Sequence, residues 1–389
     1  MYVPKRRPLL VKKGSPISVK TGSIVSLLTV LAVSTIIGAA CSSDSKTTTA
    51  ASGGSQSSSV SSSPSGSTVD YSKLSGTLNG SGSSFQDAFD QKAKTEFAKV
   101  ASGVTVNYTK SGSSAGKQDL ANQVVQFAGT DSLIKDADKP TFKGGDVLYF
   151  PTVGAPITVS FNLSGVDALK LNADVLAGIF QGDITTWNDP KIAADNSGVT
   201  LPSTAIAVVH RSDGSGTTSN FTKFLKAASP TVWKLDSGDT VQWPATTQGA
   251  EKNSGDASLI KTTDGAIGYV DLADAVNADL KLASVKNADG YFVAPTLDAA
   301  AAALAGADVA ADLTYNPLNA KGADAYPITS PTWIVVYAKQ TDAKVAEALK
   351  GWLSFLLTDG QGLAKSVGYA PLPSALAGKA IAQLAKITT

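Results

Sequence analysis

The stretch of sequence that decides the fold reads Val208-Val209-His210-Arg211-Ser212-Asp213-Gly214-Ser215-Gly216-Thr217-Thr218. An apolar run at residues 206–209 predicts a strand before it, and Phe221, Phe224 and Leu225 follow with the spacing of a helix. Glycine lets a backbone approach a ligand closely, and serine and threonine add hydroxyl donors. Because the first N–H groups of a helix have no partner within the helix, this strand–turn–helix unit predicts an anion-binding turn.

Arg211 is the only arginine after Cys41, in a part of the chain that carries 26 lysines. A guanidinium presents five N–H donors in a planar fork, which suits bidentate binding of carboxylates and oxyanions. A surface arginine without a ligand is the alternative. The interpretation therefore depends on the residues around it.

Composition limits the classes of function. After residue 40 the chain has 27 basic and 32 acidic side chains, so it is mildly acidic, which argues against a nucleic-acid partner. One cysteine excludes a disulfide framework, and one histidine excludes a histidine metal cluster. We therefore expect no metal and no cofactor. A length of 389 residues favours about two domains.

The N-terminus has the order of a lipoprotein signal peptide, residues 1–40. Six lysines and arginines precede an apolar run at residues 24–40, which ends in Gly38-Ala39-Ala40 directly before Cys41. A small-small-Cys junction resembles a bacterial lipobox, although glycine stands where leucine is usual. We expect Cys41 to carry diacylglycerol and palmitate, and an uncleaved membrane anchor is the alternative. Either way the body would lie outside the cytoplasm, tethered to the cell membrane.

Residues 41–70 are rich in serine, threonine and glycine and contain almost no large apolar side chains. Such a segment cannot bury enough surface to fold, so we expect a flexible tether.

Two further glycine- and serine-rich segments precede helical patterns. Leu78-Asn79-Gly80-Ser81-Gly82-Ser83-Ser84-Phe85 leads into a stripe of Phe85, Phe89, Ala93 and Phe97. The alternating strand 104–108 leads into Ser111-Gly112-Ser113-Ser114-Ala115-Gly116, and a helix is expected from Lys117 with Leu120 and Val124 on one face. One such turn is ordinary helix capping. Three turns, one of which contains the lone arginine, favour a shared oxyanion site.

Two aspartates accompany the donors. Asp213 is close enough to Arg211 in sequence to brace the guanidinium, and Asp131 follows a short apolar strand at 127–130. Phosphate near neutral pH still carries a proton, whereas sulfate does not. A buried carboxylate at Asp131 would therefore accept phosphate and repel sulfate. A turn or cap residue is the alternative for Asp131.

Together these motifs resemble the phosphate-binding lipoproteins of the bacterial high-affinity phosphate ABC importer, the PstS-type periplasmic binding proteins. The resemblance covers about residues 78–373, and the string 211–217 is its most specific part. The other matching segments are 80–85, 112–114, Phe127-Ala128-Gly129-Thr130-Asp131, Phe150-Pro151-Thr152, Trp187-Asn188, Gly265-Ala266-Ile267-Gly268-Tyr269 and Tyr326-Pro327-Ile328-Thr329-Ser330.

The resemblance implies the site, the partners and the fold. It implies that inorganic phosphate is delivered to permease and ATPase subunits by a monomeric binding protein, not an enzyme. The phosphate-binding residues that it implies are Ser84, Phe85 through its N–H, Ser113, Asp131, Arg211, Ser215, Gly216 and Thr217. The implied architecture is α/β, a two-lobed periplasmic-binding-protein-like fold (type II), with mixed sheets flanked by helices and a ligand cleft between the lobes.

The chain order suggests where the lobes lie. Lobe I would begin at residues 71–152, lobe II would span 153–320, and residues 321–389 would return to lobe I with a strand at 332–337 and a helix at Ala343–Leu357. The turn Asn253-Ser254-Gly255-Asp256 is a further candidate to approach the cleft.

Parts of the sequence also fit three other functions. A receptor for sulfate or molybdate would share the architecture, and Asp131 distinguishes it from a phosphate receptor. A secreted serine hydrolase would use Gly112-Ser113-Ser114-Ala115-Gly116 with His210 as base. A wall protein or adhesin would suit the tether but would not need the paired turns.

Overall fold

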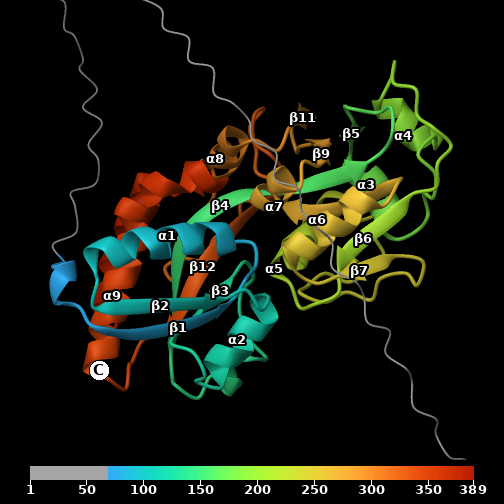
Figure 1. Ribbon diagram of the computed structural model, residues 1–389. Coiled ribbons are helices and arrows are strands. Elements are labelled where there is room, and N and C mark those ends of the chain that lie inside the picture. The colour runs from blue at the N-terminus through green and yellow to red at the C-terminus, as the bar shows by residue number, and fades with distance from the viewer. Residues whose placement is uncertain (1–68) are drawn as a thin grey trace, which may run out of the picture. The chain divides into compact units, whose positions relative to one another are not determined.

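Residues 69–389 are described by the computed structural model, and they are organised around one long mixed sheet (Figure 1). Its strand order is β2-β1-β3-β12-β4-β8-β6-β7, and β9 and β13 pair with β4 off this path. The strands are β1 (Gly76–Gly82), β2 (Val104–Thr109), β3 (Phe127–Thr130), β4 (Val147–Asn162), β5 (Lys170–Leu171), β6 (Ala207–Arg211), β7 (Gln248–Ala250), β8 (Ala266–Asp271), β9 (Lys281–Leu282), β10 (Ser284–Lys286), β11 (Phe292–Val293), β12 (Thr329–Tyr337) and β13 (Ala370–Pro371). A separate small sheet has the order β11-β10-β5.

Helices flank the sheet. The α-helices are α1 (Asp87–Val100), α2 (Ser113–Ala121), α3 (Ala173–Phe180), α4 (Pro190–Asp195), α5 (Gly216–Ala228), α6 (Lys252–Thr262), α7 (Leu272–Asn277), α8 (Leu297–Ala305), α9 (Ala343–Leu357) and α10 (Ser374–Gln383). Short 3₁₀ segments lie at Tyr71–Lys73, Lys139–Thr141, Asp359–Val367 and Leu384–Lys386. The fold class predicted from the sequence, mixed α/β, is confirmed.

Strand β4 links the two halves of the sheet. Residues 147–156 pair antiparallel with β12, and residues 157–162 pair antiparallel with β8. All but its ends are buried, as expected for a strand covered on both faces. The predicted limits of the lobes stay a prediction, and this continuous strand runs across position 152, where the first limit was set.

The two halves have the same local plan. Strands β2, β1 and β3 are parallel to one another on one side, and β8, β6 and β7 are parallel on the other. In each half a helix or a buried loop follows the strand's carboxyl end. Parallel α/β sheets bind ligands at this edge, because the loops and helix N-termini that follow the strands gather there.

Two helix predictions are confirmed. Of the predicted stripe, Phe89, Ala93 and Phe97 lie on α1 and are buried, because a four-residue spacing keeps these side chains on one face. Phe85, its first residue, lies before the helix begins at Asp87. The amphipathic pattern at Ala343–Leu357 is α9, which Asp342 caps by accepting from the N–H of Val345 at 3.0 Å.

In the first glycine- and serine-rich segment, β1 extends to Gly82. Two local predictions for the second segment are wrong. Helix α2 begins at Ser113 rather than Lys117. It ends at Ala121, since Gln123 adopts a left-handed conformation with φ 60°. Val124 therefore lies beyond the helix and is 64% exposed instead of sharing a face with Leu120.

The glycines of β1 serve close strand packing. A Cβ on Gly80 would lie 2.1 Å from the Phe127 ring, and one on Gly82 would lie 2.1 Å from the carbonyl oxygen of Gly129.

The predicted signal peptide (1–40), Cys41 and the predicted tether up to residue 68 lie outside the described residues. Within residues 69–389 no helix has the length and apolar character needed to span a membrane.

Candidate anion-binding site

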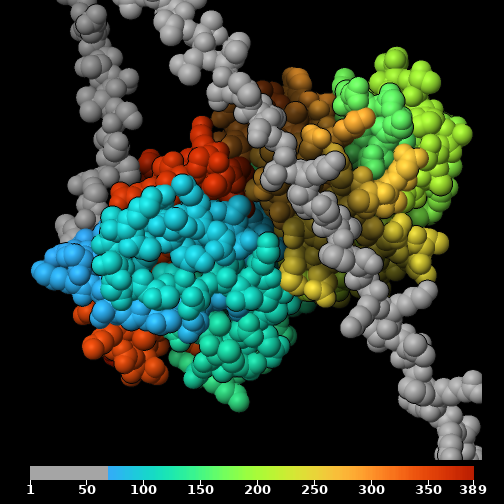
Figure 2. Space-filling view, in the orientation of Figure 1, coloured from blue at the N-terminus to red at the C-terminus, as the bar shows by residue number. Residues whose placement is uncertain are grey.

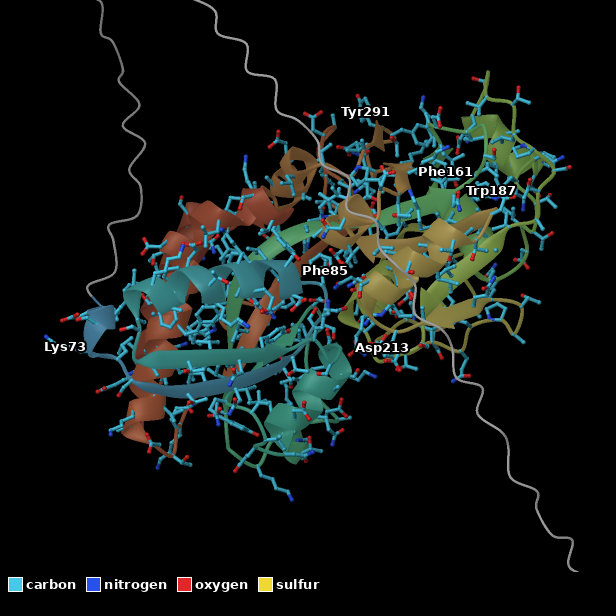
Figure 3. All side chains as sticks on the ribbon, viewed as in Figure 1. Lys73, Phe85, Phe161, Trp187, Asp213 and Tyr291 are labelled. Atoms are coloured by element: carbon cyan, nitrogen blue, oxygen red, sulfur yellow. The ribbon has the colours of Figure 1, made fainter. Side chains whose placement is uncertain are left out.

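The predicted site residues lie on loops that follow strands of both halves. Ser84 and Phe85 follow β1, Ser113 begins α2 after β2, and Asp131 follows β3. The segment 211–217 runs from the end of β6 into α5. In Figure 3, Phe85 and Asp213 mark these two groups of loops.

The two groups are in direct contact. A Cβ added to Gly216 would lie 2.6 Å from Ser113 Oγ and 2.8 Å from Asp131 Oδ2. Asn220, one turn further along α5, donates to the carbonyl oxygen of Asp131 at 2.6 Å. The N-termini of α2 and α5 and the Asp131 carboxylate therefore converge, which the sequence predicted without being able to show it.

Asp131 is almost fully buried, with 2% of its surface exposed. Its Oδ1 accepts from Ser83 Oγ at 2.6 Å and from Thr332 Oγ1 at 2.9 Å. Among the described residues its Oδ2 accepts one hydrogen bond, from Ser113 Oγ at 3.5 Å, and this oxygen faces the start of α5. One carboxylate oxygen thus contacts two protein hydroxyls, and the other retains acceptor capacity on the side of the site.

Burial raises the pKa of Asp131 to about 6, and the hydroxyls of Ser83 and Thr332 and the charge of Arg211 limit the rise. At neutral pH the carboxylate is therefore largely ionised and can accept a proton-bearing ligand oxygen. Ser83 and Thr332 were not predicted as part of the site. Ser83 adjoins the predicted Ser84, and nothing in the local sequence says which of the two serines faces Asp131.

Arg211 ends β6 with its side chain buried, and the whole residue is 4% exposed. Its Nε and Nη2 donate to Asp213 Oδ1 and Oδ2, both at 2.7 Å, which fixes the plane of the guanidinium. This pair uses two of the five N–H donors, and the other three make no hydrogen bond within residues 69–389. Burial acts to lower the pKa of Arg211, but Asp213 more than offsets it, so the side chain stays charged.

Asp213 is held by a second cation. Lys252, the first residue of α6, donates to its two oxygens through N–H at 3.2 Å and Nζ at 3.0 Å. Burial raises the pKa of Asp213, but Arg211 and Lys252 outweigh this effect and lower it to about 2. Asp213 is therefore ionised at any physiological pH, and the net charge of the Arg211–Asp213 pair is zero.

The start of α5 supplies backbone donors. Ser215 Oγ caps the helix by accepting from the N–H of Thr218 at 3.2 Å, and Ser215 N–H donates to the carbonyl of Asp239 at 2.9 Å. The N–H groups of Gly216 and Thr217 belong to the first helical turn, which has no intrahelical acceptors for them. The contribution of Ser215 is thus its hydroxyl, because its N–H is already used.

Ser84 and Phe85 lie at the same junction. The hydroxyl of Ser84 accepts from the backbone N–H and from Nδ2 of Asn253, both at 3.2 Å. The N–H of Phe85 donates to Ser83 Oγ at 3.0 Å, and its ring is buried against Tyr369. In this structure the N–H of Phe85 therefore has an acceptor within the protein.

Asn253 is the main residue that sequence reasoning placed incompletely. Its segment was expected as a turn near the cleft, but it lies in the first turn of α6, and Asn253 is fully buried. It contacts Ser84 from one half of the sheet and Thr217 Oγ1, at 3.2 Å, from the other.

An ion pair beside the site also joins the two halves. Lys117 Nζ lies 2.8 Å from Asp239 Oδ2, and Ser114 Oγ donates to the same oxygen at 2.9 Å. On the face shown in Figure 2, the teal surface around α2 abuts the yellow surface of the later segment. A cavity of about 240 Å³ lies next to this pair and is lined in part by Lys117, Lys135 and Asp239.

The geometry disfavours a serine hydrolase. The ring of His210 stacks on Trp243 at 5.1 Å, and its Nδ1 lies 3.0 Å from the carbonyl oxygen of Arg211. Among the described residues His210 makes no hydrogen bond to a serine. Over the same part of the chain, no group of three or more histidine, cysteine, aspartate and glutamate side chains could hold a metal ion.

Comparison with known proteins agrees with the fold. The class is that of the periplasmic binding proteins, since the family model described as PBP superfamily domain matches residues 48–360. Phosphate-binding protein PstS 3 of Mycobacterium tuberculosis is 36% identical over 310 residues, 76% of this chain and 83% of that protein. Phosphate-binding protein PstS 2 of the same species is 32% identical over 378 residues, 93% of this chain and 98% of that protein. The chain belongs to the PstS family of phosphate-binding proteins.

A solved structure extends the comparison. A high affinity periplasmic phosphate-binding protein, determined with bound phosphate, superposes with a TM-score of 0.67 at 25% identity and covers 79% of this chain and 94% of its own. The chain thus has the two-lobed fold of this class.

Proposed function

We propose that this protein captures inorganic phosphate outside the cytoplasm and delivers it to the permease and ATPase subunits of a phosphate ABC importer. Phosphate would lie where α2, α5 and Arg211 meet Asp131. The residues that bind it would be the eight predicted ones, Ser84, Phe85, Ser113, Asp131, Arg211, Ser215, Gly216 and Thr217, with Asp213 bracing the guanidinium. Phosphate would replace Ser83 Oγ as the acceptor of the Phe85 N–H. The names of the relatives support phosphate as the ligand, and the resemblance of the sequence motifs to the binding proteins of a phosphate ABC importer supports the transporter.

The observation that carries the proposal is the balance of donors and acceptors. Within residues 69–389, three N–H donors of Arg211 make no hydrogen bond to the protein, and helix N-termini and hydroxyls add other donors. Asp131 Oδ2 is an ionisable acceptor that faces the start of α5. A site with many donors and one carboxylate acceptor suits an oxyanion that keeps one proton, which is phosphate and not sulfate.

Binding from both halves would also hold the halves together. A ligand shifts an equilibrium between open and closed states only by its different affinity for them, and contacts from both sides supply that difference. Charge-assisted hydrogen bonds contribute about 1.5–3 kcal/mol each before the costs of desolvation and closure. We expect micromolar or tighter affinity and no catalytic step.

Calorimetric titration of the full chain with phosphate, and separately with sulfate at the same ionic strength, tests the proposal. Tight phosphate binding with weak or undetectable sulfate binding is the expected result. Tight sulfate binding would favour the receptor for another oxyanion instead.

We also propose that the mature protein begins at Cys41, carries a lipid there and lies on the extracytoplasmic face of the cell membrane as a monomer. The order of charged, apolar and small residues before Cys41 supports this. Metabolic labelling with a radioactive fatty acid should mark the wild-type protein in cells, and Cys41→Ala should abolish the label. Labelling that persisted in the variant would contradict lipidation at this residue.

A further inference from the structure

We infer that Asn253 is a positioning residue that fixes the direction of the hydrogen bonds offered by Ser84 and Thr217, so that both hydroxyls donate toward the anion. This inference deepens the proposed function and rests on it. Nothing in the family resemblance or in the relatives' names assigns a role to Asn253.

The orientation of the Asn253 amide is decided by its neighbours. Its oxygen accepts from the backbone N–H of Asp271 at 3.3 Å, and a backbone N–H can only donate. The other end of the amide must therefore be the NH₂ group. That group faces Ser84 Oγ and Thr217 Oγ1, both at 3.2 Å.

Ser84 consequently has no acceptor capacity left. A hydroxyl has two acceptor sites and one proton, and Asn253 fills both sites on Ser84 Oγ with its backbone N–H and its Nδ2–H. No acceptor within residues 69–389 takes the proton of Ser84. The proton is therefore available to a ligand oxygen, and an unprotonated, charged oxygen is its best acceptor.

Thr217 is constrained in the same sense but less completely. Asn253 occupies one of its two acceptor sites, and no described residue accepts its proton. The hydroxyl is thus biased toward donation. Because Ser84 and Thr217 belong to different halves of the sheet, the Asn253 side chain orients a hydroxyl donor on each side of the site.

The backbone around Asn253 supports this placement. Lys252, the residue before it, has a left-handed φ of 65°, a conformation that costs energy for a side chain other than glycine. Two hydrogen bonds from Lys252 to Asp213 accompany this conformation. The Arg211 brace and the Asn253 amide are thus fixed by the same turn.

The consequence is selectivity for the protonation state of the ligand. With Ser84 held as a donor and Thr217 biased toward donation, Asp131 is the acceptor for a ligand proton, so the site favours the phosphate species with one proton over the species with two. Loss of the Asn253 amide would let both hydroxyls rotate and accept. The variant should then lose affinity for monohydrogen phosphate while tolerating dihydrogen phosphate better.

A double-mutant cycle tests the inference. Asn253→Ala should weaken phosphate binding at about pH 8 by about tenfold, the loss of about one oriented hydrogen bond. In a Ser84→Ala, Thr217→Val background the same change should have less than about a threefold effect, because the hydroxyls through which it acts are gone. Ser254→Ala, an exposed change one residue along α6, is the matched control and should bind as wild type.

The pH profile supplies a readout that a purely structural role would not move. The ratio of the phosphate affinity at about pH 5 to the affinity at about pH 8 should be larger in Asn253→Ala than in wild type. If Asn253→Ala did not fold, Asn253→Asp keeps the oxygen that accepts from Asp271 and reverses the bonds to the hydroxyls. Asn253→Asp should bind phosphate more weakly than Ser254→Ala does. The Ser84→Ala, Thr217→Val background should reduce the size of that loss.

An equal loss in the wild-type and hydroxyl-free backgrounds would overturn the inference, as would an unchanged pH ratio. Failure of the wild-type protein to bind phosphate would instead overturn the proposed function. The two failures are therefore distinguishable in the same set of titrations.

Discussion

Replacing Asp131 by asparagine should stabilise the ligand-free protein while weakening its binding of phosphate. The carboxylate is buried, and its pKa is raised from an ordinary value of 3.8 to about 6. A raised pKa means that the folded state binds the proton more tightly than the unfolded state. The cost of holding the ionised group is therefore absent below about pH 4 and complete above about pH 6.

The size of this cost follows from the shift. About two pKa units correspond to about 3 kcal/mol at neutral pH. Asparagine has nearly the same shape and no charge, and its oxygen can still accept from Ser83 and Thr332. The free energy of unfolding of Asp131→Asn should thus exceed that of wild type by about 1–3 kcal/mol at pH 8, with the difference fading near pH 4.

Ligand affinity should change in the opposite direction. The amide NH₂ would replace Asp131 Oδ2, so a phosphate hydroxyl would lose its charged acceptor. A lost hydrogen bond to a charged group costs about 1.5–3 kcal/mol, or roughly a 10- to 150-fold weaker Kd. Sulfate, which needs no acceptor, should bind the variant better than it binds wild type.

Urea unfolding of the ligand-free proteins at several pH values and calorimetry with both anions measure these effects. Asp312→Asn, an exposed change away from the site, is a suitable control. Phosphate affinity equal to that of wild type would refute the role given to Asp131. A variant less stable than wild type at pH 8 would refute the account of its burial.

Three further predictions follow from the same geometry. Lys117→Met should lower the free energy of unfolding at neutral pH by about 3 kcal/mol, because it leaves the largely buried Asp239 without its ion-pair partner. Urea unfolding measures this, with Lys135→Met as the control, and an equal loss of stability in both variants would contradict the role of the ion pair. Gly216→Ala should raise the phosphate Kd measured by calorimetry at least about tenfold, because the new Cβ would lie 2.6 Å from Ser113 Oγ. Unchanged affinity would refute the close approach of α5 to Ser113. Sulfate affinity should rise as pH falls from about 8 to about 5, because Asp131 then takes the proton that sulfate cannot supply, and a flat calorimetric profile would contradict its pKa of about 6.

Local patterns predicted the elements well where periodicity was strong. The stripe on α1, the strand at β2 and the whole of α9 follow from side-chain spacing alone, because burial of one face dictates that spacing. The limit between strand and turn around the glycines of β1 could not be set from the sequence, because glycine occurs in both. Only the neighbouring strand shows that Gly80 is required for packing against the Phe127 ring.

The site was predictable in its residue types but not in its connections. The lone Arg211 and the nearby Asp213 form a local pair, so their contact could be expected from sequence separation. Thr332 reaches Asp131 from more than 200 positions away, on a strand with a register shift between Pro331 and Trp333. No local motif marks such a residue, because its role arises only from sheet pairing.

Asn253 illustrates the same limit. Its segment contains serine, glycine and aspartate and therefore resembles a turn, but it forms the beginning of a helix after a left-handed Lys252. The bonds to Ser84 and Thr217 depend on how the two halves of the sheet meet. Sequence spacing does not determine which residues of the two halves come into contact.

The crystal structure of the full chain soaked or grown with phosphate tests the central claim most directly. The account predicts one phosphate that contacts the unpaired N–H donors of Arg211, the first N–H groups of α5 and Ser113, with one of its oxygens within hydrogen-bond distance of Asp131 Oδ2. Phosphate bound elsewhere, for example in the cavity beside Lys117, with Arg211 and Asp131 making no contact to it, would contradict the account.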